Sequence, residues 1–252
     1  MQLRNMTWPQ IDQLSRQTPV LIPIAAVEQH GHHLPLYTDS ILLGEVVRRA
    51  EEPLANDILV APLQWYGNSH HHMDFAGTLS AEPRVYLDLL VSLLDNFIAH
   101  GFERLFLING HGGNDVPGKQ ALFEVRQKYR QRNDLLLLFS TYWTLGCRPP
   151  ESVPELRQTE MGHACEWETS MILRIAPELV GDYHQAETIE HGNPFLPATR
   201  AWITKDRSPP GHIGWPQLAT ADKGEALLTM FSRDVTQLLQ RMIDWDGKSW
   251  DG

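Results

Sequence analysis

The first two thirds of the chain alternate short apolar runs with segments whose apolar residues recur at helical spacing. The continuous apolar runs predict buried strands at residues 20–26, 58–63, 104–108 and 135–141. Helical periodicity predicts helices at residues 40–51, 84–100, 116–132 and 223–245. Asp39 or Ser40 is the expected N-cap of the first helix, and Gly101 ends the second. This alternation predicts an α/β fold, a three-layer αβα arrangement with a mainly parallel sheet.

Two long stretches rich in proline, glycine and polar residues predict loops at residues 144–160 and 184–217. Loops of this length within a compact domain often act as lids or binding loops. The 252 residues fit one large α/β domain or two small ones. The strand and helix alternation favours the first, so we expect a single domain over residues 1–252.

Composition excludes several classes of protein. A hydrophobic fraction of 42% can fill a substantial core. The net charge of −10 argues against a nucleic-acid-binding surface, which needs clustered lysine and arginine. Two cysteines, Cys147 and Cys165, provide no disulfide framework. The N-terminus lacks the apolar segment of a secretory signal, and no apolar run approaches the roughly 20 residues that span a bilayer. We therefore expect a cytoplasmic protein without membrane contact.

Metal-competent side chains are densest after the first predicted strand, in EQHGHHLPLYTD at residues 28–39. Carboxylate oxygens and neutral imidazole nitrogens suit zinc, manganese and iron, and one carboxylate can bridge two ions. Glu28 and His30 share a face of extended backbone, and Asp39 can return to them after the turn at residues 31–35. Taken alone, this segment fits a polar surface loop about as well as a metal site.

A second segment, NGHGGN at residues 109–114, follows another apolar strand. Its glycines allow the backbone to approach a ligand closely. No lysine follows, so the spacing does not match a phosphate-binding loop, and His111 favours a metal site over a simple turn. Glu28 and His111 both lie just past strand ends, where ligands collect in open α/β sheets. We expect them to meet at one edge of the sheet.

The third segment, HACEWETS at residues 163–170, predicts a helix that starts near His163 and runs to about Ile175. His163 and Glu166 are three residues apart and share a face of such a helix, whereas Glu168 lies away from His163. Acidic residues also favour a helix N-terminus through the helix dipole. The helix dipole accounts for Glu166 and Glu168 without any functional site, but it does not account for His163.

Three successive histidines occur in YGNSHHHMDFAGT at residues 66–78. They cannot all face one ion, so we expect one or two of them at the site. Trp143 and Trp167 are candidate walls of a pocket for a flat or ring-shaped substrate, although tryptophan is more often found in the core.

Together and in this order, the four segments resemble the creatininase (creatinine amidohydrolase) family over about residues 18–176. The resemblance implies a creatininase-like α/β fold, two divalent metal ions, hydrolysis of amide-type bonds, and homo-oligomers, often hexamers. The residues that match metal ligands are Glu28, His30, Asp39 and His111. The match makes Asp39 the bridge between the ions. His72 matches the single histidine usual in the second motif, where we expect it to contact the substrate, with His70 and His71 as extra residues.

Three positions depart from the family pattern. Gly113 stands where members that hydrolyse creatinine carry a metal-ligating glutamate, which argues against creatinine as the substrate. Ala76 and His32 each replace a common proline. If a fifth ligand is still needed, we expect Glu166 to supply it, with Glu168 as the alternative and as a partner that orients a ligand.

These residues predict a metal-dependent hydrolase, and the family resemblance implies a small-molecule substrate such as a cyclic amide or formamide. Two ions would lower the pKa of a water, while His163 donates a proton to the leaving group or holds the oxyanion. Glu168 is the second candidate catalytic residue. Other branches of the family deformylate a pyrimidine nucleotide precursor, trim a cofactor-precursor peptide or hydrolyse an oxidised cyclitol. The alternatives are a hydrolase, lyase or isomerase that acts on an oxidised cyclitol or other cyclic ketone through a metal-stabilised enolate, and a catalytically inactive binding protein.

Overall fold

The computed structural model describes residues 1–146, 148–153, 155–190 and 192–249. At its centre lies a parallel four-stranded sheet in the order β2-β1-β3-β4. In chain order, β1 to β4 are Val20–Ile24, Leu59–Val60, Arg104–Asn109 and Leu136–Thr141. The four strands are the four apolar runs expected from the sequence. The second is much shorter than its run, which contains Pro62, a residue with no N–H for the ladder.

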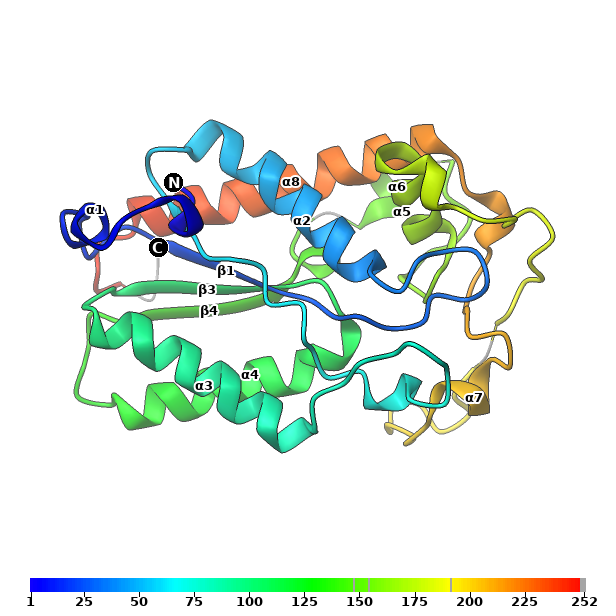
Figure 1. Ribbon diagram of the computed structural model, residues 1–252, viewed down its shortest axis with the longest axis horizontal. Coiled ribbons are helices and arrows are strands. Elements are labelled where there is room, and N and C mark those ends of the chain that lie inside the picture. The colour runs from blue at the N-terminus through cyan, green and yellow to red at the C-terminus, as the bar shows by residue number, and fades with distance from the viewer. Residues whose placement is uncertain (147, 154, 191, 250–252) are drawn as a thin grey trace.

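Helices cover both faces of this sheet. Their bounds are α1 Trp8–Asp12, α2 Thr38–Glu51, α3 Pro83–Ala99, α4 Asp115–Lys128, α5 Pro149–Ser152, α6 Glu166–Ile175, α7 Thr204–Arg207 and α8 Ala221–Asp244. Helices α2, α6 and α8 pack together on one face, and α3 and α4 pack together on the other (Figure 1). The fold is therefore the expected three-layer αβα arrangement.

Successive strand residues face the two helix layers in turn. Leu21 and Phe106 belong to the core against α2, α6 and α8, whereas Ile22 and Leu107 belong to the core against α3 and α4. All four side chains are fully buried. Because β1 and β3 are buried on both faces, they read as continuous apolar runs rather than as alternating patterns, whereas the edge strand β4 is only partly buried.

The strand register sets the position of the residues with chemical groups. Ile24, the last residue of β1, pairs with Asn109, the last residue of β3. The segments that follow both strands therefore leave the sheet at the same edge. This geometry confirms the expectation that Glu28 and His111 follow the carboxyl ends of neighbouring strands.

Two helix starts differ from the sequence-based expectation. Helix α2 begins at Thr38 after Tyr37, so Asp39 lies inside its first turn and is not the N-cap. Helix α6 begins at Glu166 rather than near His163. Ala164 has a φ of 47° and Cys165 is extended, and neither conformation fits a helix.

Long irregular segments complete the chain. Residues 144–160 contain α5, and residues 184–217 contain α7. Cys165 is buried and free, whereas Cys147 lies outside the described residues. None of the helices in the described ranges combines the length and apolar character that a membrane crossing requires.

Candidate metal centre

Four side chains from three parts of the fold meet at the carboxyl edge of the sheet. Glu28 and His30 follow β1, Asp39 lies in α2, and His111 follows β3; all four are buried. His111 Nδ1 lies 3.3 Å from Glu28 Oε1 and 3.1 Å from Asp39 Oδ2. His30 Nε2 lies 3.2 Å from Asp39 Oδ1. Asp39 thus stands between the two imidazoles and presents one oxygen to each.

Backbone carbonyls fix which nitrogen of each imidazole faces this cluster. A carbonyl oxygen only accepts hydrogen bonds, so His30 Nδ1–H donates to the Glu28 carbonyl at 3.1 Å. In the same way, His111 Nε2–H donates to the Asn68 carbonyl at 3.0 Å. The remaining nitrogens, His30 Nε2 and His111 Nδ1, are the atoms that point at the carboxylates. Orientation of an imidazole by its second nitrogen is typical of metal-ligating histidines.

The structure corrects the expected placement of the two glutamates in α6. Glu166 faces away from the cluster: its carboxylate accepts hydrogen bonds from the amides of Arg157 and Gln158 and pairs with Lys223 Nζ at 2.6 Å. Glu168 Oε1 instead lies 3.7 Å from His30 Nε2. The cause is the later helix start, which turns Glu166 sideways and brings Glu168 to the sheet edge. Glu168 is therefore the carboxylate with the right position to complete the cluster.

His163 lies at the wall of the same cluster. Its Nε2–H donates to the Gln29 carbonyl at 2.7 Å, which leaves Nδ1 facing Glu28 Oε1 at 3.6 Å. The ring also lies 4.3 Å from the ring of His30, centroid to centroid. His163 can therefore exchange a proton at Nδ1 with a group held between it and the carboxylates.

His72 contacts the carboxylate of Glu28 from the other side. Its Nε2 lies 3.4 Å from Glu28 Oε1, while Nδ1 accepts a hydrogen bond from Gln29 Nε2 at 2.7 Å. Nδ1 also lies 3.0 Å from Thr204 Oγ1. The ring is almost fully buried, with 3% of its surface exposed. These contacts suit a residue that orients Glu28 more than one that contacts a substrate.

The buried carboxylates carry oxygens without a hydrogen-bond partner. Among the described residues, no donor bonds to Glu28 Oε2, Asp39 Oδ2 or Glu168 Oε2, since the His111 Nδ1 that faces Asp39 carries no proton when Nε2–H donates to Asn68. An unpaired buried carboxylate is costly, on the order of several kcal/mol, unless a cation lies beside it. Two divalent ions would more than offset the three negative charges, and this set of oxygen and nitrogen donors suits zinc, manganese and iron. The residues present therefore fit a two-metal centre.

The pKa values of the histidines beside the buried carboxylates also show that positive charge is favoured in the cluster. Burial lowers the pKa of His111, but Glu28 and Asp39 outweigh it and raise that pKa to about 10. Burial likewise opposes the charged form of His30, but Asp39 and Glu168 bring its pKa well above the ordinary value. His163 differs: burial and the neighbouring His30 lower its pKa to about 3. The carboxylates thus favour cations beside them, while His163 stays neutral.

The two tryptophans expected to wall a substrate pocket both pack with the hydrophobic core: Trp167 lies within it, and Trp143 is partly buried against it. Trp167 is buried, its Nε1–H donates to the Gln158 carbonyl, and its ring packs towards Phe231. Its predicted role as a pocket wall does not agree with this position. Trp143 packs edge-on against Tyr142 beside the same core. The sequence alone cannot distinguish a tryptophan in the core from one that lines a pocket, because the ring is at least partly buried in either place.

Gln29 is a site residue that the sequence reading missed. Its side-chain amide donates to His72 Nδ1 and to the Gly211 carbonyl, and its backbone carbonyl accepts from His163. Its position between Glu28 and His30 was the feature of the sequence that could have indicated a role at the site. Thr204 was missed as well, because nothing in a long loop predicts which hydroxyl reaches the site.

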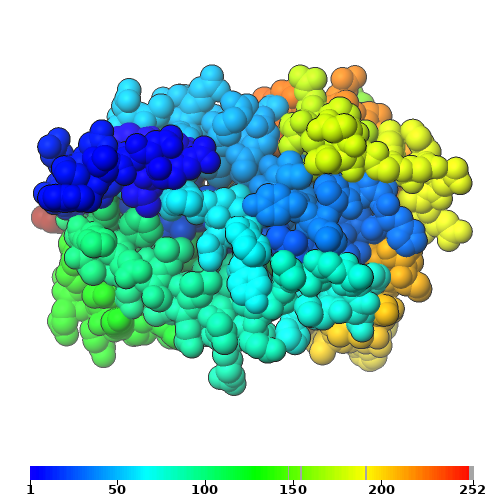
Figure 2. Space-filling view, viewed as in Figure 1, coloured from blue at the N-terminus to red at the C-terminus, as the bar shows by residue number. Residues whose placement is uncertain are grey.

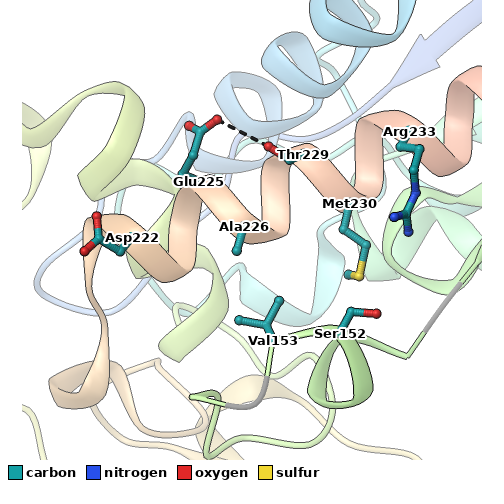
Figure 3. Close-up of a pocket in the computed structure, with 8 residues that line it drawn as sticks. All are labelled: Ser152, Val153, Asp222, Glu225, Ala226, Thr229, Met230 and Arg233. Carbon is teal, nitrogen blue, oxygen red and sulfur yellow. Dashed lines mark hydrogen bonds between the residues drawn. The ribbon is translucent and has the colours of Figure 1, made fainter.

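A surface depression of about 420 Å³ lies apart from this cluster, between α5 and α8 (Figure 3). It is lined by Ser152, Val153, Asp222, Glu225, Ala226, Thr229, Met230 and Arg233. It contains no imidazole, and the carboxylate of Glu225 is paired with Arg49 and Arg174. The chemistry of the molecule therefore belongs to the buried cluster.

Comparisons with known proteins point to one family. The family model for creatinine amidohydrolase matches residues 4–239. The mycofactocin precursor peptide peptidase of Mycolicibacterium smegmatis is 31% identical over 243 residues, covering 92% of this chain and 88% of that protein. The 3-dehydro-scyllo-inosose hydrolase of Thermotoga maritima is 28% identical over 268 residues, covering 94% and 83%.

Solved structures share the fold. A creatininase variant complexed with creatine has a TM-score of 0.82 at 23% identity, covering 96% of this chain and 98% of that one. Creatininases described as zinc–zinc and manganese forms each have a TM-score of 0.80.

Proposed function

Because this chain belongs to the creatinine amidohydrolase (creatininase) family and is a metal-dependent hydrolase of that kind, we propose that it cleaves a carbon–nitrogen bond of amide type with two divalent ions. The observation that carries the proposal is the buried group of three carboxylates with unpaired oxygens, beside imidazole nitrogens that face them. The zinc and manganese forms of creatininases with this fold support the choice of divalent ions.

The proposed ligands divide into two sets that share Asp39. Glu28, Asp39 and His111 hold one ion, and His30, Asp39 and Glu168 hold the other. The distances of 3.1–3.3 Å from Asp39 to His30 and His111, and from Glu28 to His111, support these sets. Glu168 takes the place that the sequence had suggested for Glu166, since it alone of the two faces His30. Zinc, manganese and iron all suit such donors.

When bound, the two ions lower the pKa of a water molecule towards neutrality and polarise the substrate carbonyl. His163 then moves the proton. Its Nδ1 accepts a proton from the water as the new carbon–oxygen bond forms, and returns it to the nitrogen as the carbon–nitrogen bond breaks. The hydrogen bond from Nε2–H to the Gln29 carbonyl holds the ring in the tautomer that this transfer needs.

The proposed substrate is a cyclic amide, a formamide or a similar amide, and Gly113 argues against creatinine. The relative that acts on a precursor peptide supports C–N cleavage. A second candidate is the hydrolysis, or the lyase or isomerase conversion, of an oxidised cyclitol or other cyclic ketone. It is favoured by the inosose hydrolase, which aligns with 94% of this chain.

Metal analysis followed by a substrate screen in ¹⁸O-labelled water tests this proposal. We expect two ions per chain, and turnover of an amide with one ¹⁸O in the acid product. Turnover of a cyclic ketone without ¹⁸O would favour the lyase or isomerase alternative. A purified protein without metal would point to an inactive binding protein.

Replacement of His163 tests its role in proton transfer. We expect His163→Ala to lower kcat by about 10²–10⁴-fold while both ions stay bound, since general acid–base catalysis contributes about this much. His184→Ala, which removes an exposed histidine, is the control and should keep full activity. If His163→Ala has wild-type kcat, the assigned role is wrong.

The quaternary structure and cellular location belong to the same proposal. We infer a homo-oligomer, with a hexamer as the form that the family resemblance implies, in the cytoplasm. Light scattering of the purified protein gives the number of subunits.

A further inference from the structure

The three successive histidines of the second motif lie on a short 3-10 helix, His70–His72, beside the metal centre. They differ in what they face. His70 is exposed and belongs to none of the groups of metal-competent side chains. His72 belongs to such a group, with Glu28 and His163, but its Nδ1 already accepts a hydrogen bond from Gln29 and lies beside Thr204 Oγ1. The third histidine, His71, has surroundings that differ from those of both His70 and His72.

His71 reaches the centre next to His111. One ring nitrogen of His71, one of His111 and one oxygen of Glu28 lie within 4.8 Å of one another. The two rings are stacked, with centroids 5.7 Å apart and planes 12° from parallel. Within the described ranges, His71 has no hydrogen-bond partner, although its ring is half-buried. The ring nitrogens of His71 are therefore not engaged by any described residue and can bind a ligand from outside the chain.

The backbone around His71 is arranged to admit its ring. A Cβ at Gly113 would lie 2.9 Å from His71 Cε1, 2.2 Å from the Asn68 carbonyl oxygen and 2.4 Å from His111 Nε2. No side chain at position 113 is compatible with this arrangement. The space that a larger residue would occupy is taken first by the Asn68 carbonyl oxygen and the ring of His111, and next by the ring of His71. Gly113 is the position at which the chain departs from creatinine-hydrolysing members, and its lack of a side chain leaves room for the rings of both His111 and His71.

A second segment holds His71 from outside. The ring of Trp202, just before α7, meets His71 edge-on, with centroids 5.1 Å apart at 82°. Lys205 of α7 lies over the ring of Phe75, 5.6 Å from its centroid. The segment around α7 therefore packs on the loop that carries the histidines (Figure 1), and the space-filling view shows the two side by side at one end of the molecule (Figure 2). The ring of His71 is thus supported on two sides.

We propose that His71 is a fourth protein ligand of the ion held by Glu28, Asp39 and His111. The inference rests on the proposed function, because it presupposes a two-ion centre. An ion with three protein donors reaches four-coordination when this imidazole joins it. The other ion, with His30, Asp39 and Glu168, then keeps the position open to water and substrate. The two ions consequently differ in affinity, the one beside His71 being the tighter.

The test compares His71→Ala with His70→Ala in the full-length protein. Both variants remove one imidazole from the same 3-10 helix, but only one removes the proposed ligand. Dissociation constants for two zinc ions are measured by competition with a chromophoric chelator. We expect His71→Ala to weaken one ion by about 100-fold and His70→Ala to change neither by more than about twofold. His71→Asn provides a second variant that keeps a polar side chain, and circular dichroism confirms its fold.

A second readout is the visible spectrum of the cobalt-substituted protein, which depends on coordination number and donor type. His71→Ala should change the spectrum of one of the two cobalt ions, and His70→Ala should leave both unchanged. Wild-type affinities and spectra in His71→Ala and His71→Asn would overturn the proposal. Fewer than two ions in the wild-type protein would overturn the proposed two-ion function itself, and the assignment of His71 with it.

Discussion

Replacing Glu166 and Glu168 of α6 by glutamine, one at a time, tests which of the two buried carboxylates stabilises the fold and which binds metal. Glu166 is fully buried, and its oxygens accept from the amides of Arg157 and Gln158 and from Lys223. Glutamine offers one acceptor oxygen in place of two, so Glu166→Gln leaves at least one buried donor without a partner. We expect this change to unfold the protein more easily and to leave the metal content alone.

The magnitude follows from the contacts. Breaking a buried ion pair costs about 3–5 kcal/mol. Lys223 keeps a hydrogen bond to the Leu218 carbonyl, and 14% of its side chain is exposed. The lower end, about 3 kcal/mol, is therefore expected for Glu166→Gln. For a chain of this size about 1 kcal/mol shifts Tm by about 2–4 °C, so Tm should fall by about 6–12 °C.

Glu168→Gln should have the opposite profile. Glu168 Oε2 has no hydrogen-bond partner within the described part of the chain, so the folded protein should lose little when the charge is removed, about 1 kcal/mol or less. The ion that Glu168 holds with His30 should be lost, which leaves about one ion per chain in elemental analysis. Thermal unfolding is compared in chelator, so that metal binding does not contribute to Tm.

The double variant Glu166→Gln/Lys223→Met supplies the control. If the two side chains act as a pair, the double variant should lose less stability than the sum of the single variants. The reasoning is refuted if Glu166→Gln binds one ion fewer at an unchanged Tm, while Glu168→Gln binds two.

Three further predictions concern the metal centre and one surface ion pair. Asp39→Ala should bind neither ion, because its two oxygens serve both, whereas His30→Ala should keep one; equal metal content in the wild type and Asp39→Ala would disprove the bridge. Removing metal with a chelator should lower Tm by about 5–10 °C, since ligand at 100 times its Kd contributes about 2.7 kcal/mol; scanning fluorimetry measures it, and an unchanged Tm contradicts a bound ion. Hydrogen bonds from Arg49 and Arg174 lower the pKa of Glu225 to about 2, so Glu225→Gln should cost about 1 kcal/mol at pH 7. That contribution exists above the unfolded pKa of 4.5 and is lost as pH falls through about 2; urea unfolding of both proteins across this range should converge, and a constant difference would contradict it.

The sheet and its edge could be predicted because buried parallel strands leave a direct trace in the sequence. The run that became β1 and the central residues of β3 and β4, 105–108 and 136–139, are apolar, since helices cover both faces of the sheet. The residues that follow β1 and β3 carry the first ligands, so the topology alone brings Glu28 and His111 together. The positions of the strand ends were sufficient to predict that these two ligands lie close together.

The contribution of α6 could not be predicted for a conformational reason. Spacing gives the relative direction of Glu166 and Glu168 only when the first helical residue is known. Ala164 adopts a positive φ, which alanine rarely does, and tertiary contacts hold it there. His33 Nε2, for example, lies 3.0 Å from the Ala164 carbonyl oxygen. A shift of the helix start by three residues exchanged the roles of the two glutamates.

The hydrogen bonds of Gln29 restrict how new substrate preferences can arise in such an enzyme. Gln29 links His72 and His163 to Gly211, and the backbone of Ile213 pairs with that of His163. The loop at residues 195–214, which a substrate-specificity graft would exchange, is thus anchored to His163, the residue proposed to move the proton. If His163 has that role, a graft restricted to this loop should disturb proton transfer along with substrate recognition. Recombination between family members should therefore transfer this loop as one block with the histidine segment at residues 66–78.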